Sequence, residues 1–172
     1  GQSQADFMTF LNSDCWVAPK WDLPVLAALT GDARAAIAAP TANQGEQHAP
    51  HEASEPTEPT PAALARVAEN LVRLGAGKVR DGRPYGFCLT VRKSAWIALG
   101  GFDEKIPLYG ADDEFCARAR IAGWRTLVVL DSYCWHKGGA NAAVAQKAGR
   151  IDVKIAHAQG LAAIAERGLK KA

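Results

Sequence analysis

Three groups of residues in this chain carry side chains that can do chemistry. Asp14 closes the triplet Asn12-Ser13-Asp14 directly after the apolar run 7–11, the acidic cluster Asp112-Asp113-Glu114 lies far downstream, and His136 follows it. A carboxylate at the end of a buried strand lies at the sheet edge where open α/β sheets bind ligands. Carboxylates and an imidazole at three such strand ends can bind a divalent cation or transfer a proton.

Each group also has a simpler structural interpretation. Asp14 alone could end a strand or cap a helix, because aspartate favours both positions. The acidic cluster would be stabilised by the dipole at a helix N-terminus, and Glu114 could pair with Arg118 one turn later. His136 could be a core histidine, and zinc is disfavoured because no Cys or His pair stands at a suitable spacing. Only the order of the three groups favours a site.

The elements that must position these groups alternate between strands and helices, which predicts a layered α/β fold. The apolar run 6–11 and the segments 85–91 and 125–130 are predicted as strands, the last two for their aromatic and β-branched residues. Residues 33–39 fit either a strand or a helix. Helices are predicted for residues 23–29, for 94–99 before Gly100, and for 113–122 before Gly123.

Two further helices follow from caps and spacing. Thr60 and Pro61 supply an N-cap and a proline at the first helical position, and the apolar residues that then repeat at helical spacing are Leu64, Val67, Leu71 and Leu74. One apolar face of a last helix is predicted from Ile151, Ile155, Ala158, Ala162 and Ala165. Residues 44–61 hold four prolines, four glutamates and two histidines. Such a segment cannot bury enough apolar surface to order itself, so it is predicted to be a flexible insertion.

Composition excludes several classes of protein. With 172 residues, 48% hydrophobic and 22% charged, the chain has the size and composition of one globular domain. A net charge of +2 without a basic stripe argues against nucleic acid as a partner. No apolar run approaches the roughly 18 residues needed to span a bilayer, and no signal peptide opens the chain, so a cytoplasmic location is expected. The four cysteines are widely spaced, as reduced core thiols would be.

Four segments of the chain resemble family 2 of the glycosyltransferases, which have a GT-A fold. Phe10-Leu11-Asn12-Ser13-Asp14 with Trp21 resembles the family's metal-binding aspartate-x-aspartate segment. The family's acceptor-side block is similar to Gly86-Phe87-Cys88-Leu89, Arg92-Lys93, Gly100-Gly101-Phe102-Asp103-Glu104 and Tyr109-Gly110. Its acidic helix is similar to Asp112-Asp113-Glu114-Phe115-Cys116 with Arg118, Ala122, Gly123 and Trp124, and its closing histidine segment to His136-Lys137-Gly138-Gly139.

The resemblance implies a mixed, Rossmann-like sheet flanked by helices, with residues 33–39 as one of its strands. Residues 1–139 would form the GT-A core, with the insertion at 44–61, and residues 140–172 a C-terminal helical extension. This covers roughly the C-terminal two thirds of such a domain, without its N-terminal nucleotide-binding strands. Gly1 is not an initiator methionine, which also fits a partial chain. An N-terminal partner segment or a second copy of the chain is expected to cover the open edge.

The function that the resemblance implies is metal-dependent transfer of a sugar, with inversion, from a nucleotide-sugar donor to a hydroxyl of a saccharide or other acceptor. Asn12, Ser13 and Asp14 would bind the donor. The metal, Mn²⁺ or Mg²⁺, would bind Asp14 and His136, and the imidazole favours Mn²⁺.

For the chemical step, the resemblance implies that Asp112 is the general base. Ala111 stands where the family often has an acidic residue, so Asp113 is the alternative base. The acceptor-side residues would be Gly86, Phe87, Glu114 and Trp124. The alternative function is a non-catalytic carbohydrate-binding or assembly module that keeps only the acceptor half of the site. A purely structural partner domain is the third, if the acidic residues bind no metal.

Overall fold

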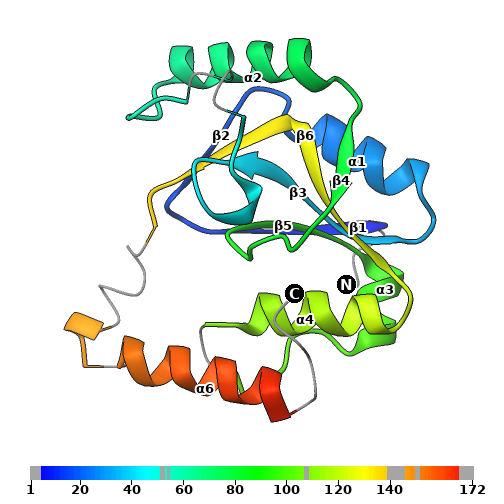
Figure 1. The fold of residues 1–172 in the computed structure, drawn as a ribbon, viewed down its shortest axis with the longest axis vertical. Helices are drawn as coiled ribbons and strands as arrows, with labels where there is room; N and C mark the ends of the chain where they lie inside the picture. Colours follow the sequence, from blue (N-terminus) through cyan, green and yellow to red (C-terminus); the bar gives the residue numbers. More distant parts are fainter. Residues whose placement is uncertain are drawn as a thin grey trace.

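The chain folds into a six-stranded mixed β-sheet that lies between two layers of helices (Figure 1). The computed structural model describes residues 5–50, 53, 55–106, 109–138, 146–149 and 152–166. The strands are β1 (Phe7–Leu11), β2 (Cys15–Val17), β3 (Ala35–Ala42), β4 (Val79–Asp81), β5 (Cys88–Arg92) and β6 (Arg125–His136). Their order in the sheet is β1-β5-β3-β6-β2, and β4 also pairs with β6.

The central strand is β3, and all eight of its residues are buried. It runs antiparallel to β5 and parallel to β6. Its register with β6 shifts after Pro40, which has no N–H to donate to a neighbouring strand. Because β3 and β6 are parallel and both end near the pair Ala42–Cys134, the residues that follow them meet at one edge of the sheet.

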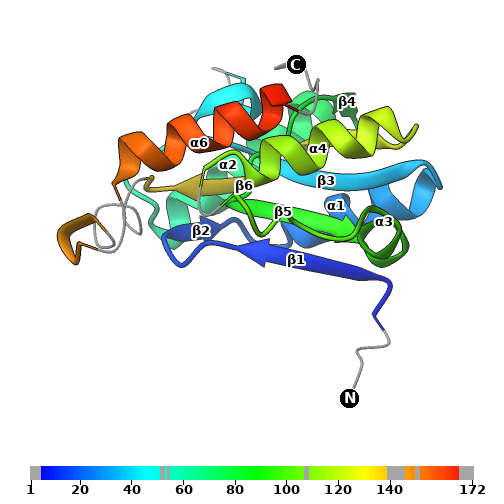
Figure 2. The same cartoon turned by 90° about the horizontal axis from the view of Figure 1, so that it is seen from below.

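Helices cover both faces of the sheet. On one face, α1 (Asp22–Gly31) packs on β3 and β6, and α2 (Pro61–Gly75) packs on β6. On the other face lie α3 (Lys93–Leu99) and α4 (Ala111–Ile121), and α6 (Val153–Glu166) lies beside α4 (Figure 2). A short 3₁₀ turn, η1 (Gly45–Gln47), follows β3. This arrangement confirms the mixed α/β fold class.

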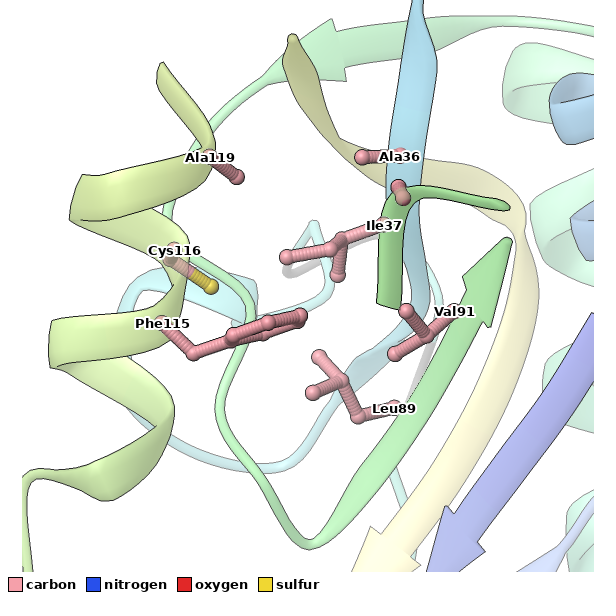
Figure 3. Close-up of a cluster of buried hydrophobic side chains, with 8 residues drawn as sticks. Ala36, Ile37, Leu89, Val91, Phe115, Cys116 and Ala119 are labelled. Carbon is pink, nitrogen blue, oxygen red and sulfur yellow. The ribbon is translucent and has the colours of Figure 1, made fainter. Parts of the chain in front are cut away.

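The core under α4 fixes the position of that helix. Its side chains come from the sheet and from α4 and interdigitate in one cluster (Figure 3): Ala36, Ile37, Leu89, Val91, Phe115, Cys116 and Ala119. Phe10 of β1 packs against this cluster and lies 5.1 Å from the ring of Trp96 in α3. Burial of aromatic and aliphatic side chains from both elements therefore holds the N-terminus of α4 near the start of β5.

Most predicted elements are confirmed, and their differences from the predictions have local causes. Thr60 caps α2 as expected, because its Oγ1 accepts a hydrogen bond from the N–H of Ala63 at 3.3 Å. Residues 33–39 fall in a strand. β5 begins at Cys88, three residues later than predicted, because the residues before it bind other parts of the chain, as described below. β6 continues to His136, and neither β2 nor β4 was predicted.

The apolar face predicted for the last helix is wrong. The predicted residues Ile155, Ala158, Ala162 and Ala165 are exposed, while Ala156, Gly160 and Ile164 are buried. Ile151 lies outside the described residues. The reason is a backbone contact: a Cβ atom at Gly160 would clash with the carbonyl oxygen of Tyr109, just before α4. A pattern of apolar residues cannot reveal a face that packs through glycine.

Residues 44–61 pack more closely than their composition predicts. Gln47, Ala49 and Ala53 are buried. Nε2 of Gln47 donates to the carbonyl oxygen of Pro40 at 2.7 Å, and Oε1 of Gln47 accepts from the N–H of Tyr85 at 2.5 Å. The NH₂ group and the oxygen of this buried amide are therefore both hydrogen-bonded. The flexibility of this insertion stays a prediction, and residues 51, 52 and 54 lie outside the described residues.

Several other expectations stay predictions. Among the described strands, β1 pairs only with β5, so the expected partner segment or second copy has an edge to pair with. The boundary at residue 139 lies outside the described residues. No helix in the described part of the chain has the length and apolar character to cross a membrane, and the cytoplasmic location stays a prediction. All four cysteines are free thiols.

Candidate functional site

Asp14 lies in the turn between β1 and β2 and is 7% exposed. Two backbone hydrogen bonds hold this turn. The N–H of Cys15 donates to the carbonyl oxygen of Asn12 at 3.2 Å. The N–H of Lys137 donates to the carbonyl oxygen of Asp14 at 3.0 Å. β2 then pairs antiparallel with the end of β6, which places Cys15 opposite His136. The turn is therefore fixed beside the end of β6.

His136 brings its ring to the Asp14 carboxylate. Its Nε2 lies 3.3 Å from Oδ1 of Asp14. That oxygen is buried and has no aligned hydrogen bond within the described part of the chain. Burial lowers the pKa of His136 below its ordinary value of 6.5, although the nearby Asp14 carboxylate opposes this shift. The ring is therefore neutral at neutral pH.

Cys15 is a residue of this site that the sequence prediction missed. One donor atom each of Asp14, Cys15 and His136 lies within 4.8 Å of the others, and we call these three residues the donor cluster. The thiol of Cys15 donates to the carbonyl oxygen of Phe87 at 3.4 Å. Contact with the thiol of Cys134, together with burial, raises the pKa of Cys15 well above its ordinary value. Only the register of β2 against β6 could have revealed this neighbour of His136.

Gly86 and Phe87 connect the donor cluster to α4. The carbonyl oxygen of Phe87 accepts from the N–H of Asn12 at 2.8 Å, and its ring stacks on His136 with centroids 4.4 Å apart. The N–H of Gly86 donates to Oδ2 of Asp112 at 2.6 Å. A Cβ atom at Gly86 would lie 3.0 Å from the Cβ of Asp112, so glycine allows this close approach. The three predicted groups thus converge on Gly86 and Phe87.

The two candidate bases have different surroundings. Asp112 lies in the first turn of α4, is half-buried, and accepts the hydrogen bond from Gly86. Asp113 is one residue further on, and its Oδ1 lies 3.2 Å from Nε of Arg83. The Asp113 carboxylate is therefore paired with a cation of the protein, whereas that of Asp112 is held by a neutral N–H.

Glu114 makes a structural contact. Its side chain is fully buried, and its two oxygens accept from Nε and Nη2 of Arg118 at 2.6 and 2.7 Å. Arg118 also donates to the carbonyl oxygens of Leu99 and Gly101, so the pair ties α4 to the end of α3. The simpler interpretation of Glu114 is confirmed. Its acceptor-side role stays a prediction that this contact does not support.

The remaining predicted residues lie at different distances from the site. Asn12 is partly exposed and Ser13 is exposed, and both lie in the turn with Asp14. Trp124 packs on the core cluster beyond the C-terminal end of α4. The N–H of Trp124 donates to the carbonyl oxygen of Ala119 at 3.0 Å, and a rise of about 1.5 Å per residue places Ala119 roughly 10 Å along the helix from Asp112. The structure does not bring Trp124 to the site.

Asn43 and Gln44 are two further residues that the prediction missed. Oδ1 of Asn43 accepts from the N–H of His136 at 2.8 Å, and Nδ2 of Asn43 donates to the carbonyl oxygen of His136 at 3.0 Å. The side-chain amide of Gln44 lies 2.5 Å from Nδ1 of the His136 ring. Both residues follow β3 directly, where the parallel pairing with β6 brings them to His136.

No family model matches this chain, and no curated protein matches its sequence. Among solved structures, it is similar to the crystal structure of GalNAc-T7 with UDP, GalNAc and Mn²⁺. The TM-score is 0.53 at 15% sequence identity, and the similarity covers 76% of this chain and 27% of that chain. This chain has a GT-A glycosyltransferase-like fold. At this identity the similarity concerns the fold alone, so membership of family 2 stays a prediction.

Proposed function

We propose that this chain forms the metal-binding and acceptor-binding part of an inverting glycosyltransferase. The reaction is transfer of a sugar from a nucleotide-sugar donor to a hydroxyl of a saccharide or other acceptor. The observation that carries the proposal is the convergence of Asp14, His136 and Asp112 around Gly86 and Phe87. The GT-A-like fold supports it. Assignment to family 2 and to the hexosyltransferases rests on the motifs alone.

The donor cluster fits a divalent cation. Oδ1 of Asp14 is buried without an aligned hydrogen bond in the described residues, and such an oxygen is costly unless positive charge compensates it. Asp14 and His136 would hold the ion, with Cys15 as a third donor within reach. A carboxylate with an imidazole suits Mn²⁺ better than Mg²⁺. The ion, when bound, would stabilise the negative charge that develops on the diphosphate leaving group.

Asp112 is the proposed general base. The hydrogen bond from Gly86 fixes its carboxylate, which would accept the proton of the acceptor hydroxyl as that hydroxyl attacks the sugar. A single displacement of this kind inverts the anomeric carbon. Asp113 is less suited to this role because its carboxylate is already paired with Arg83.

Asn12 and Ser13 are proposed to contact the donor, because they are the accessible residues of the turn that ends in Asp14. An amide and a hydroxyl can hydrogen-bond a phosphate or ribose oxygen. UDP is the first nucleotide to test, since the similar structure contains UDP.

Isothermal titration calorimetry with Mn²⁺, with UDP and with both tests this function. We expect UDP to bind only in the presence of Mn²⁺. Asp14→Ala should abolish this coupling, and Asp22→Ala, which changes an exposed aspartate in α1, should preserve it. Binding of a saccharide without metal or UDP would favour the carbohydrate-binding module instead. Absence of all binding would refute the proposal.

A further inference from the structure

The side-chain amide of Gln44 indicates which nitrogen of His136 carries the proton. Nε2 of Gln44 lies 2.5 Å from Nδ1 of His136 and 3.4 Å from the carbonyl oxygen of the same residue. A carbonyl oxygen can only accept, so the amide group that faces it is the NH₂ group. Nδ1 therefore also faces a donor and must accept. The neutral ring then carries its proton on Nε2.

This tautomer matters because Nε2 is the nitrogen that faces Asp14, at 3.3 Å from Oδ1. A protonated Nε2 has no lone pair for a cation. A cation in the donor cluster needs the other neutral tautomer, in which Nδ1–H donates to an acceptor. Metal-bound histidines commonly make such a bond to a carboxylate or carbonyl group. Gln44 can supply the acceptor if its amide turns so that Oε1 faces Nδ1.

One side of the amide borders a glycine. Gly138, with φ of 76°, lies against the amide of Gln44, and a Cβ atom there would stand 3.5 Å from Oε1 and 3.6 Å from Nε2. Glycine therefore leaves that side of both amide atoms without a side chain. The histidine itself is held in place, since Asn43 binds its backbone at two points and Phe87 stacks on its ring. The ring is therefore fixed, and a turn of the amide is the change that would expose an acceptor to Nδ1.

We propose that Gln44 is a positioning residue that switches His136 between two neutral tautomers, one closed and one open to a cation. The part of this inference that concerns a cation rests on the proposed function. The number of protons on the ring is the same in both states. The tautomer of the metal-free protein is set on both sides of the ring, by the amide of Gln44 at Nδ1 and by the Asp14 carboxylate at Nε2, and it can be measured without any ligand.

Nitrogen-15 NMR of the metal-free protein, labelled at histidine and studied at a pH where the ring is neutral, tests the tautomer. We expect a protonated Nε2 and an unprotonated Nδ1 for His136. A proton on Nδ1 in the metal-free wild type would overturn the proposal, whether or not a cation binds. Addition of Zn²⁺, which is diamagnetic, should then move the proton to Nδ1.

Variants of Gln44 test its contribution to cation affinity by calorimetry. Gln44→Met removes both donor and acceptor at nearly constant length. It should weaken Mn²⁺ and Zn²⁺ binding by about 10–100-fold, because Nδ1–H then has no partner. Gln44→Glu keeps an acceptor and should bind at least as tightly as the wild type. Gln159→Met, the same change at an exposed position of α6, should have no effect.

Two outcomes separate this inference from the proposed function. Equal affinity of the wild type and Gln44→Met would overturn the role of Gln44, even if the metal site itself is real. A wild type that binds no cation would refute the metal site of the proposed function, and the NMR result would still decide the tautomer of His136 in the metal-free protein.

Discussion

Replacing Arg118 with methionine should destabilise the protein strongly, because it removes the cation that is paired with the buried Glu114 carboxylate. Glu114 is 0% exposed in its side chain and accepts two hydrogen bonds from Arg118. Breaking a buried ion pair by removing one member costs about 3–5 kcal/mol. The lower end applies here, since Arg118 is 21% exposed and water partly screens the pair. For a chain of this size, about 3 kcal/mol corresponds to a fall in Tm of roughly 6–12 °C.

Urea unfolding followed by circular dichroism measures this loss. Arg66→Met, at an exposed position of α2, is the matched control and should change the free energy of unfolding by less than about 0.5 kcal/mol. The double variant Glu114→Met/Arg118→Met should regain stability relative to Arg118→Met, because it removes the buried charge as well. A loss below about 1 kcal/mol in Arg118→Met, or no recovery in the double variant, would refute a structural role for the pair.

Three further predictions follow from the site and its surroundings. In an enzyme that also contains the N-terminal nucleotide-binding strands, Asp112→Asn should slow transfer by about 10²–10⁴-fold in kinetic assays while calorimetry shows unchanged donor affinity, since a base acts in the chemical step; an ordinary rate would exclude Asp112. Gly160→Ala should lower the free energy of unfolding by about 1–3 kcal/mol, measured by thermal unfolding, because the new Cβ meets the carbonyl oxygen of Tyr109. Gly31→Ala, at a position with open space around it, should not destabilise the protein. Equal effects of the two variants would contradict the packing of α6. Burial raises the pKa of Glu55 above its ordinary 4.5, so the native carboxyl keeps its proton where the unfolded one loses it. Stability should therefore fall as pH rises from 4.5 through the raised pKa, and Glu55→Gln should remove that part of the pH dependence of urea unfolding.

Secondary structure could be predicted wherever the signal is local. Thr60 and Pro61 mark the start of α2, and Gly100, with φ of 77°, marks the end of α3. β2 and β4 have three residues each, too few for an alternating pattern, and they exist because β6 pairs with them. α6 was assigned the wrong face because its contact passes through the backbone at Gly160.

The site could be predicted only in part, for a related reason. Asp14, Asp112 and His136 stand out by residue type and by order along the chain. Cys15 and Gln44 do not, because their positions beside His136 come from strand register and from the parallel ends of β3 and β6. Gln44 also lies in a polar segment whose composition indicates a loop, and composition says nothing about which ring a single amide will reach.

The contacts of the site join parts of the chain that are far apart, and this constrains when the site can form during folding. His136 meets Gln44 and Asn43 across 92 and 93 positions, and Cys15 meets Phe87 across 72. Loop closure over such separations opposes these contacts until strand pairing stabilises them, and non-local pairing is slow. A nascent chain that has not yet produced β6 therefore contains Asp14 and Asp112 but no site. Ligand binding should return during refolding only with the step that pairs β6 with β3.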